Sequence, residues 1–320
     1  MRLAAAISIH DVYEARKRIG PYITRTPLHH YAQLDRLIGA EVHVKHENHQ
    51  AIGVFKIRGA LNVIAQLTDE EKQRGVVCAS TGNFGQGIAY AAAVFGVRST
   101  VVVPEGANPD KCASMRLLGA EVVHFGANFD ACRGLCEQLV STEGRVYIHS
   151  ADEPRLIPGV ATLALEIIED LPEVEAIVVP VGGGSGACGA CVVADALNPD
   201  VRVIGVQAEK APGAYLSWKA GEIVEAKMQT IAEGLSTTMG FELTQAIMRK
   251  LMDDFVLVSE EELVEAIGLY LETTHNLAEH AGAAPLAAAI KIKDRLAGKK
   301  VALVMSGGNI TRQHLREALA

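Results

Sequence analysis

The stretch Glu47-Asn48-His49-Gln50-Ala51-Ile52-Gly53-Val54-Phe55-Lys56-Ile57-Arg58-Gly59-Ala60 holds a single lysine, Lys56, inside an apolar segment flanked by glycines. The pattern predicts the end of a strand that turns into a helix. A lysine amine that loses its water in such a place binds its proton less tightly and becomes a nucleophile, suited to a Schiff base. An ordinary surface lysine at a helix start is the alternative, and this segment alone does not decide between the two.

The overall composition is that of a globular chain with a sizeable core. Of the 320 residues, 49% are hydrophobic and 21% are charged, which argues against disorder and allows one large or two modest α/β domains. The net charge of −8 argues against nucleic acid or an anionic membrane surface as a partner. The longest apolar runs, such as 88–97, are about half as long as a membrane span. Residues 1–7 show no clear cleavage site, so we expect mature sequence rather than a signal peptide.

Cysteines and histidines raise the question of disulfides or metal. Two pairs of cysteines have helical spacing, and cysteine among small residues behaves as a small hydrophobe. On a strand, His43 and His46 point to opposite faces, so one ion could not collect these two together with His49. We therefore predict no metal site, no disulfide and a reducing, cytoplasmic location. The six cysteines are Cys78, Cys112, Cys132, Cys136, Cys188 and Cys191.

Short β-branched runs alternate with alanine-rich helical stretches along the chain. Continuous apolar strands separated by helices predict parallel sheets that are covered on both faces. We expect an α/β fold with two open, mostly parallel sheets, each flanked by helices, and a ligand cleft at the carboxyl ends of the strands. The expected strands are 41–45, 75–79, 99–103, 121–125, 176–181, 202–207 and 300–304. The expected helices include 59–67, 85–95, 109–118, 129–142, 159–170 and 260–275.

A glycine-rich loop, Val181-Gly182-Gly183-Gly184-Ser185-Gly186-Ala187, follows an expected strand and precedes an expected helix. Glycines let backbone N–H groups approach an anion, and the helix N-terminus adds partial positive charge, so the loop suits a phosphate. A dinucleotide site is a strong alternative, because 184–189 fits G-x-G-x-x-G and Glu209 follows about twenty residues later. A tight turn without a ligand is the third possibility.

Two further loops end strands with hydroxyl and amide side chains. Ser80-Thr81-Gly82-Asn83-Phe84 precedes a helix, and hydroxyls beside a helix N-terminus suit a carboxylate. The same residue types are common as purely structural N-caps. Met305-Ser306-Gly307-Gly308-Asn309 closes the last strand, where a hydroxyl could meet a ring nitrogen or cap the terminal helix.

Taken together, these segments resemble the fold-type II family of pyridoxal-phosphate enzymes, in the threonine/serine dehydratase and serine racemase group. The match runs in order over nearly the whole chain, and the ordered set is far more specific than any single loop. The resemblance implies a tryptophan synthase β-like fold with the cofactor, pyridoxal 5′-phosphate, in the cleft between two domains. The expected large domain comprises residues 1–51 and 152–320, and the expected small domain comprises residues 52–151. The resemblance also sets the dinucleotide interpretation aside.

The resemblance assigns roles residue by residue. Lys56 would form the Schiff base and act as base, and Thr81 could act as a second acid or base. The expected cofactor-binding residues are Phe55, Lys56, Asn83, Gly182, Gly183, Gly184, Ser185, Gly186, Gly234, Glu279 and Ser306. The expected substrate-binding residues are Ser80, Thr81, Gly82, Asn83 and Phe84.

Four departures from the family pattern bear on which amino acid fits. Val54 stands where serine is usual, Phe84 where histidine is usual, and His280 where a small residue is usual. Residues 158–162 replace a common Ala-Gly-Gln-Gly-Thr. We do not expect the metal site of the racemase members here, because Glu209 matches one carboxylate and 210–215 offers no second.

The resemblance implies an ammonia-lyase that converts a 3-hydroxy amino acid such as L-threonine or L-serine to the 2-oxo acid and ammonia. A serine or amino-acid racemase, or a dehydratase of a bulkier substrate such as phenylserine, is the alternative. We expect an apolar substrate pocket near Phe84, without arginine in 80–86. We also expect no feedback-inhibited regulatory domain after Ser306 and, by family analogy, a homodimer.

Overall fold

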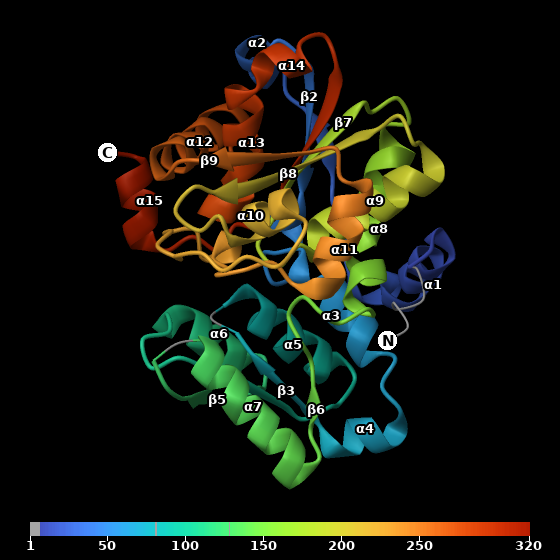
Figure 1. The fold of residues 1–320 in the computed structure, drawn as a ribbon, viewed down its shortest axis with the longest axis vertical. Helices are drawn as coiled ribbons and strands as arrows, with labels where there is room; N and C mark the ends of the chain where they lie inside the picture. Colours follow the sequence, from blue (N-terminus) through green and yellow to red (C-terminus); the bar gives the residue numbers. More distant parts are fainter. Residues whose placement is uncertain (1–6, 81, 128) are drawn as a thin grey trace.

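The structure is a computed structural model that describes residues 7–80, 82–127 and 129–320. It contains two sheets in two lobes, with helix α3 (Lys56–Ile64) at their junction (Figure 1). The predicted α/β architecture with two open, mostly parallel sheets flanked by helices is confirmed. Within this described part of the chain, no helix is both long and apolar enough to cross a membrane.

The larger sheet has six strands in the order β1-β2-β10-β7-β8-β9. All neighbours pair in parallel except β1, which runs antiparallel to β2 at the edge. The strands are β1 Leu28–His30, β2 Glu41–His46, β7 Ala176–Pro180, β8 Arg202–Ala208, β9 Asp254–Val258 and β10 Lys300–Met305.

Alternate side chains of these strands enter two separate cores, as the period of a strand requires. In β10, Ala302 and Val304 face the core formed with α8 and α9, whereas Val301 and Leu303 face the core formed with α12 and α13. Both faces are therefore covered, which explains why the strands read as continuous apolar runs.

The smaller sheet has four parallel strands in the order β5-β4-β3-β6. Helix α7 packs on one face, where Val77 and Val102 meet Cys132 and Cys136. Helix α5 packs on the other face. The strands are β3 Val76–Ala79, β4 Ser99–Val103, β5 Glu121–His124 and β6 Val146–Tyr147. These strands lie inside the expected small domain, but the domain boundaries themselves stay a prediction.

The described helices surround the two sheets. The α-helices are α1 Ile9–Ile19, α2 Ala32–Ile38, α3 Lys56–Ile64, α4 Asp69–Arg74, α5 Asn83–Val94, α6 Pro109–Leu117, α7 Phe129–Glu143, α8 Leu156–Asp170, α9 Ser185–Leu197, α10 Gly213–Ala220, α11 Glu242–Leu251, α12 Glu260–Thr274, α13 His280–Lys291, α14 Lys293–Leu296 and α15 Arg312–Ala318. Short 3-10 turns are η1 Gly20–Tyr22, η2 Glu47–His49 and η3 Glu233–Leu235.

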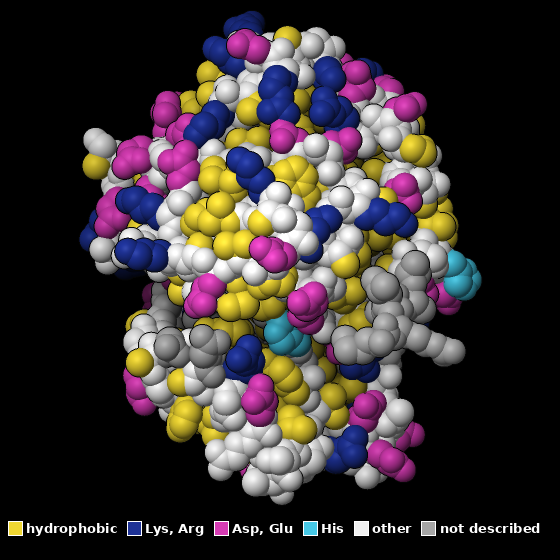
Figure 2. All heavy atoms as spheres, viewed as in Figure 1, with side chains coloured by type: hydrophobic (Ala, Val, Ile, Leu, Met, Phe, Trp, Pro, Cys, Tyr) yellow, Lys and Arg dark blue, Asp and Glu magenta, His cyan; other side chains and the backbone are white. Residues whose placement is uncertain are grey.

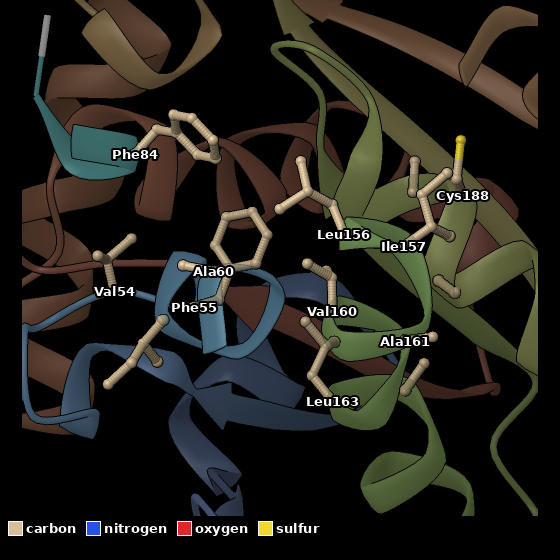
Figure 3. Close-up of a cluster of buried hydrophobic side chains, with 14 of the residues drawn as sticks. Val54, Phe55, Ala60, Phe84, Leu156, Ile157, Val160, Ala161, Leu163 and Cys188 are labelled. Carbon is tan, nitrogen blue, oxygen red and sulfur yellow. The ribbon is translucent and has the colours of Figure 1, made fainter. Parts of the chain in front are cut away.

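Helix α3 joins the lobes because it packs against α5 of the small lobe and α8 of the large one. Two glycines permit the close crossing with α8: a Cβ on Gly59 would lie 2.9 Å from Val160 Cγ2, and a Cβ on Gly159 would lie 2.5 Å from the Arg58 carbonyl oxygen. Figure 3 shows the hydrophobic cluster at this junction, with Phe55 beside α3 and Leu156 and Val160 on α8.

Charge is spread over the surface without a basic patch on the face shown in Figure 2, where Lys and Arg side chains intermingle with Asp and Glu. The six cysteines are buried and unpaired. Among the described residues, no group of three or more His, Cys, Asp or Glu side chains could hold a metal ion.

Candidate active site

Lys56 is the first residue of α3, at the point where the chain leaves the large sheet. The segment before it is held against the end of β10: Val54 forms a bridge with Gly307, and the Phe55 N–H donates to the Ser306 carbonyl at 3.0 Å. The predicted helix is present and begins three residues earlier than predicted, but an isolated bridge at Val54, not the end of a strand, precedes it, because β2 ends at His46. The lysine and the last strand, some 250 residues apart in sequence, are brought together by these bonds.

The Lys56 amine lies in protein surroundings at the floor of a cleft. Its Nζ lies 3.4 Å from the Ser185 hydroxyl and 4.9 Å from the centre of the Phe55 ring. Loss of water around the ammonium lowers the pKa of Lys56 to about 8, because burial disfavours the charged form. The amine is therefore partly unprotonated near neutral pH, as a nucleophile or base requires.

A single cavity collects all the residues expected to bind the cofactor. It has about 400 Å³ of empty space, part of it open to solvent. Its lining consists of Val54, Phe55, Lys56, Asn83, Pro180, Gly182, Gly183, Gly184, Ser185, Gly186, Gly234, Glu279, Ala281 and Ser306. The structure thus brings this predicted set together, and the role of each residue stays a prediction.

The glycine loop forms one end of this cavity. Helix α9 begins at Ser185, and Gly184 before it adopts φ +94°, a conformation that favours glycine. A Cβ on Gly182 would lie 2.3 Å from the Gly234 carbonyl oxygen, so only glycine fits there. The first N–H groups of a helix have no partner within it, and together with the helix dipole they favour a phosphate. This donor set fits the phosphate of pyridoxal phosphate.

Asn83 is fixed by two neighbours that come from distant segments. Its Nδ2 donates to Glu279 Oε1 at 2.5 Å, and its Oδ1 accepts from Asn309 Nδ2 at 2.9 Å. Asn309 also donates to the Ile52 carbonyl at 3.1 Å. Burial raises the pKa of the Glu279 carboxyl, which the Lys111 ammonium opposes. The sequence places Asn309 in the motif that closes the last strand, but it does not indicate that Asn309 orients Asn83, since only the fold brings the two together.

The loop after β3 combines capping with the expected substrate contacts. The Ser80 hydroxyl oxygen accepts from the N–H groups of Gly82 and Gly85 at 3.2 and 2.8 Å. The N-cap residue of α5 is Gly82, so Ser80 is not itself the N-cap, but its oxygen binds the Gly85 N–H in the first turn. The hydroxyl proton can still be donated to a ligand. Phe84 is 6% exposed and lines the cleft, where it gives the wall an apolar surface. Thr81 lies outside the described residues.

A second, larger cavity adjoins the first and opens above the same loop. Lys56, Ser80, Gly82, Asn83 and Phe84 contribute to its lining. Phe129 and Phe241 extend the apolar wall, and Lys111 and Glu233 line it as well. Lys111 was not predicted. No local signal marks it, because it lies inside an ordinary helix, α6, which the fold places against this loop.

The family described as "Pyridoxal-phosphate dependent enzyme" matches residues 19–307. The L-threonine ammonia-lyase of Thermotoga maritima is 43% identical over 306 residues, which cover 95% of this chain and 76% of that protein. The catabolic L-threonine dehydratase TdcB of Escherichia coli K12 is 38% identical over 307 residues, which cover 95% of this chain and 93% of that protein.

Solved structures give the same result for the fold. A serine racemase from Dictyostelium discoideum superposes with a TM-score of 0.90 at 38% identity, covering 96% of this chain and 100% of that one. The T.th. threonine deaminase superposes with a TM-score of 0.90, also at 38% identity, covering 95% and 99%. The tryptophan synthase β-like fold is confirmed, and pyridoxal 5′-phosphate is the cofactor. The chain belongs to the fold-type II pyridoxal-phosphate-dependent enzymes, in the threonine/serine dehydratase and serine racemase group.

Proposed function

We propose that the protein is an ammonia-lyase that converts L-threonine, L-serine or a similar 3-hydroxy amino acid to the 2-oxo acid and ammonia. The observation that carries this proposal is near-full-length similarity to two threonine-dehydrating enzymes. A partly unprotonated lysine in a cavity that fits the cofactor supports it.

The cofactor would be held at both ends of the smaller cavity. The N–H groups at the start of α9 would bind its phosphate, and Lys56 would hold it covalently until the substrate arrives. Phe55 would pack beside the ring, and Asn83, kept in place by Glu279 and Asn309, would present its second amide proton to the ring hydroxyl. When bound, pyridoxal phosphate supplies a ring that accepts the electrons left at the substrate Cα.

The chain's own residues would then move the protons. The free amine of Lys56 takes the Cα proton, which a pKa near 8 allows at physiological pH. The start of α5 binds the substrate carboxylate through its N–H groups and the Ser80 hydroxyl. The neutral hydroxyl of Ser306 would not stabilise a full positive charge on the ring nitrogen of the cofactor as a carboxylate would. This favours loss of the 3-hydroxyl over transamination. Loss of that hydroxyl as water, followed by hydrolysis, gives the 2-oxo acid and ammonia.

A substrate screen tests the proposal directly. The purified holoenzyme is supplied with L-threonine, L-serine, phenylserine and 3-hydroxyaspartate, and 2-oxo acid release is measured. We expect turnover of L-threonine or L-serine, with 3-hydroxyaspartate the poorest because arginine is absent from 80–86. Holoenzyme that releases 2-oxo acid from none of the four contradicts the proposal.

Racemisation is the second candidate, favoured by the likeness to the Dictyostelium serine racemase. It needs a second acid or base on the face of the substrate opposite Lys56, for which Thr81 is the proposed group. Chiral analysis of L-serine left over in the same screen distinguishes the two activities, since elimination alone produces no D-serine. A homodimer and a cytoplasmic location stay predictions that rest on the family resemblance and, for the location, on cysteine usage.

The pH dependence of cofactor capture reports the state of Lys56. At a pH below its pKa of about 8, the Lys56 amine is mostly protonated and cannot attack the aldehyde of the cofactor. At a higher pH the free amine predominates. We expect the rate of covalent capture by the cofactor-free protein to rise with pH, reach half of its maximum near pH 8 and then level off. Absorbance stopped-flow over about pH 6 to 10 measures this. A rate that still rises at about pH 10, where an ordinary lysine titrates, contradicts it.

A further inference from the structure

An ion pair spans the mouth of the cleft between the two lobes. Lys111, on α6 of the small lobe, places its Nζ 2.5 Å from Glu233 Oε2 in η3 of the large lobe. Both side chains line the larger cavity but not the smaller one that fits the cofactor. The pair therefore belongs to the space that remains for the substrate.

The ammonium of Lys111 lies directly against the loop expected to receive the substrate carboxylate. A Cβ built on Gly82 would lie 2.8 Å from Lys111 Cδ and 3.3 Å from its Nζ. Glycine at this position thus makes room for the lysine. The same Cβ would lie 3.5 Å from Glu233 Oε2, so the ion pair sits over Gly82 at the start of α5.

The two partners differ in their access to water. The Lys111 side chain is 9% exposed, whereas that of Glu233 is 36% exposed. A charge with little access to water needs a counter-ion, because leaving it unpaired is costly. Glu233 can turn toward solvent at little cost, but Lys111 cannot. Lys111 therefore needs an anion whether or not a substrate is bound.

The charges around the cleft leave few alternatives for balancing an incoming carboxylate. Among the described residues that line the larger cavity, the basic ones are Lys56, Lys111 and Lys227. Lys227 is exposed, and Lys56 is partly unprotonated with a pKa of about 8. Glu233 would repel a carboxylate as long as it stayed in place. A buried, fixed positive charge beside the loop is thus supplied by Lys111.

We propose that Lys111 is a substrate-binding residue that exchanges Glu233 for the α-carboxylate of the amino acid. Glu233 holds the ammonium in position while the site lacks substrate, and it moves toward solvent when the substrate carboxylate arrives. The proposal rests on the proposed function in that it takes the substrate to be an amino acid. It explains how a site without arginine in 80–86 can neutralise a carboxylate beside the acidic side chain of Glu233.

The test compares an amino acid with its uncharged amide. L-Alanine has no leaving group and L-alaninamide lacks the carboxylate, so visible absorption titration of the holoenzyme gives the dissociation constant of each. For Lys111→Met we expect binding of L-alanine to weaken about 10- to 100-fold, the range of a hydrogen bond between charged groups. Binding of L-alaninamide should change less than about 3-fold. Lys111→Arg, which keeps the charge, should retain most of the affinity for L-alanine.

Two further variants separate this role from a structural one. Glu233→Gln removes the competing anion, so L-alanine should bind with equal or higher affinity. Arg116→Met, which removes an exposed cation from the same helix, should leave both ligands unaffected. Equal weakening of both ligands in Lys111→Met would overturn the proposal, since it indicates a structural defect. Weakening of L-alanine in Glu233→Gln to the level of Lys111→Met would also overturn it, since the pair would then be a latch between the lobes.

Steady-state kinetics provide a second readout. With L-threonine as substrate, Lys111→Met should raise KM about 10- to 100-fold and leave kcat within about 3-fold, because the carboxylate contact is the same in the ground and transition states. A fall in kcat with unchanged KM contradicts the proposal. Wild-type holoenzyme that binds L-alanine but turns over no hydroxy amino acid refutes the proposed function instead, and the titrations still decide the role of Lys111.

Discussion

Replacement of Lys56 by alanine is expected to abolish the turnover of every amino acid, with a loss of at least about 1,000-fold. The residue is assigned two tasks, covalent retention of the cofactor and removal of the Cα proton. A general base alone contributes about 10²- to 10⁴-fold, and no other described lysine lines the cofactor cavity. The variant should fold normally, because α3 is held by apolar packing against α5 and α8.

Borohydride reduction followed by peptide mass mapping provides the matching structural measurement. In the wild-type holoenzyme a pyridoxyl adduct should appear on the peptide that contains Lys56, and Lys56→Ala should carry none. Lys250→Ala, which removes an exposed lysine on α11, serves as the control with unchanged turnover and labelling. Dehydration that survives in Lys56→Ala would contradict its role as base, and an adduct on another lysine would contradict the placement of the cofactor.

Most strands that the sequence predicts are buried on both faces, and the exception is β5 (Glu121–His124), an exposed edge of the small sheet. Their β-branched runs, such as 99–103 and 300–304, give a signal that local sequence carries by itself. Three strands were missed. Strand β1 (Leu28–His30) is an exposed antiparallel edge, β6 (Val146–Tyr147) has only two residues, and β9 (Asp254–Val258) completes the other edge of the large sheet. Strands as short as β1 and β6 depend on a partner that only the fold supplies.

The site shows the same division between local and long-range information. The glycine loop and the Lys56 segment carry their own backbone signals, and the ordered set of segments resembled a known family. The hydrogen bonds between segments have no such local signal. Asn309 binds Asn83, which is 226 residues away in sequence, and Lys111 binds Glu233, which is 122 residues away. For Ser80 the sequence suggested both a ligand contact and an N-cap; in the structure the N-cap of α5 is Gly82, and the Ser80 oxygen accepts from the first-turn N–H of Gly85.

A buried network of four charges lies beneath the helix that carries Lys56. The Arg58 guanidinium donates to both oxygens of Glu47 at 2.8 Å and to both oxygens of Glu166 at 2.7 and 2.9 Å. Lys45 donates to Glu166 at 2.6 Å, and Thr26 donates to Glu47 at 2.6 Å. Two cations thus balance two carboxylates. Burial would raise the pKa of Glu47, but the Arg58 guanidinium, with help from the Lys45 ammonium and the Thr26 hydroxyl, holds that pKa below its ordinary value.

Replacement of Arg58 is therefore expected to lower the stability of the protein more than replacement of any surface residue. In Arg58→Met, two buried carboxylates share the single charge of Lys45, and breaking a buried ion pair costs about 3–5 kcal/mol of the free energy of unfolding. We expect Tm to fall by about 10 °C, measured by circular dichroism on cofactor-free protein, so that lost cofactor binding does not contribute. Arg58→Lys keeps the charge but cannot bind both carboxylates in a planar fork. Its Tm should therefore lie between those of the wild type and Arg58→Met.

The control is Arg316→Met, an exposed arginine on α15, which should change Tm by no more than about 2 °C. The comparison decides whether the network only balances its own charges or also holds the start of α3. If it holds α3, the folded fraction of Arg58→Met should capture pyridoxal phosphate more slowly at every pH, because the Lys56 amine is less well placed. If Arg58→Met melts within about 2 °C of the wild type, the network is not what fixes this helix, and the apolar crossing of α3 and α8 must hold Lys56 in place by itself.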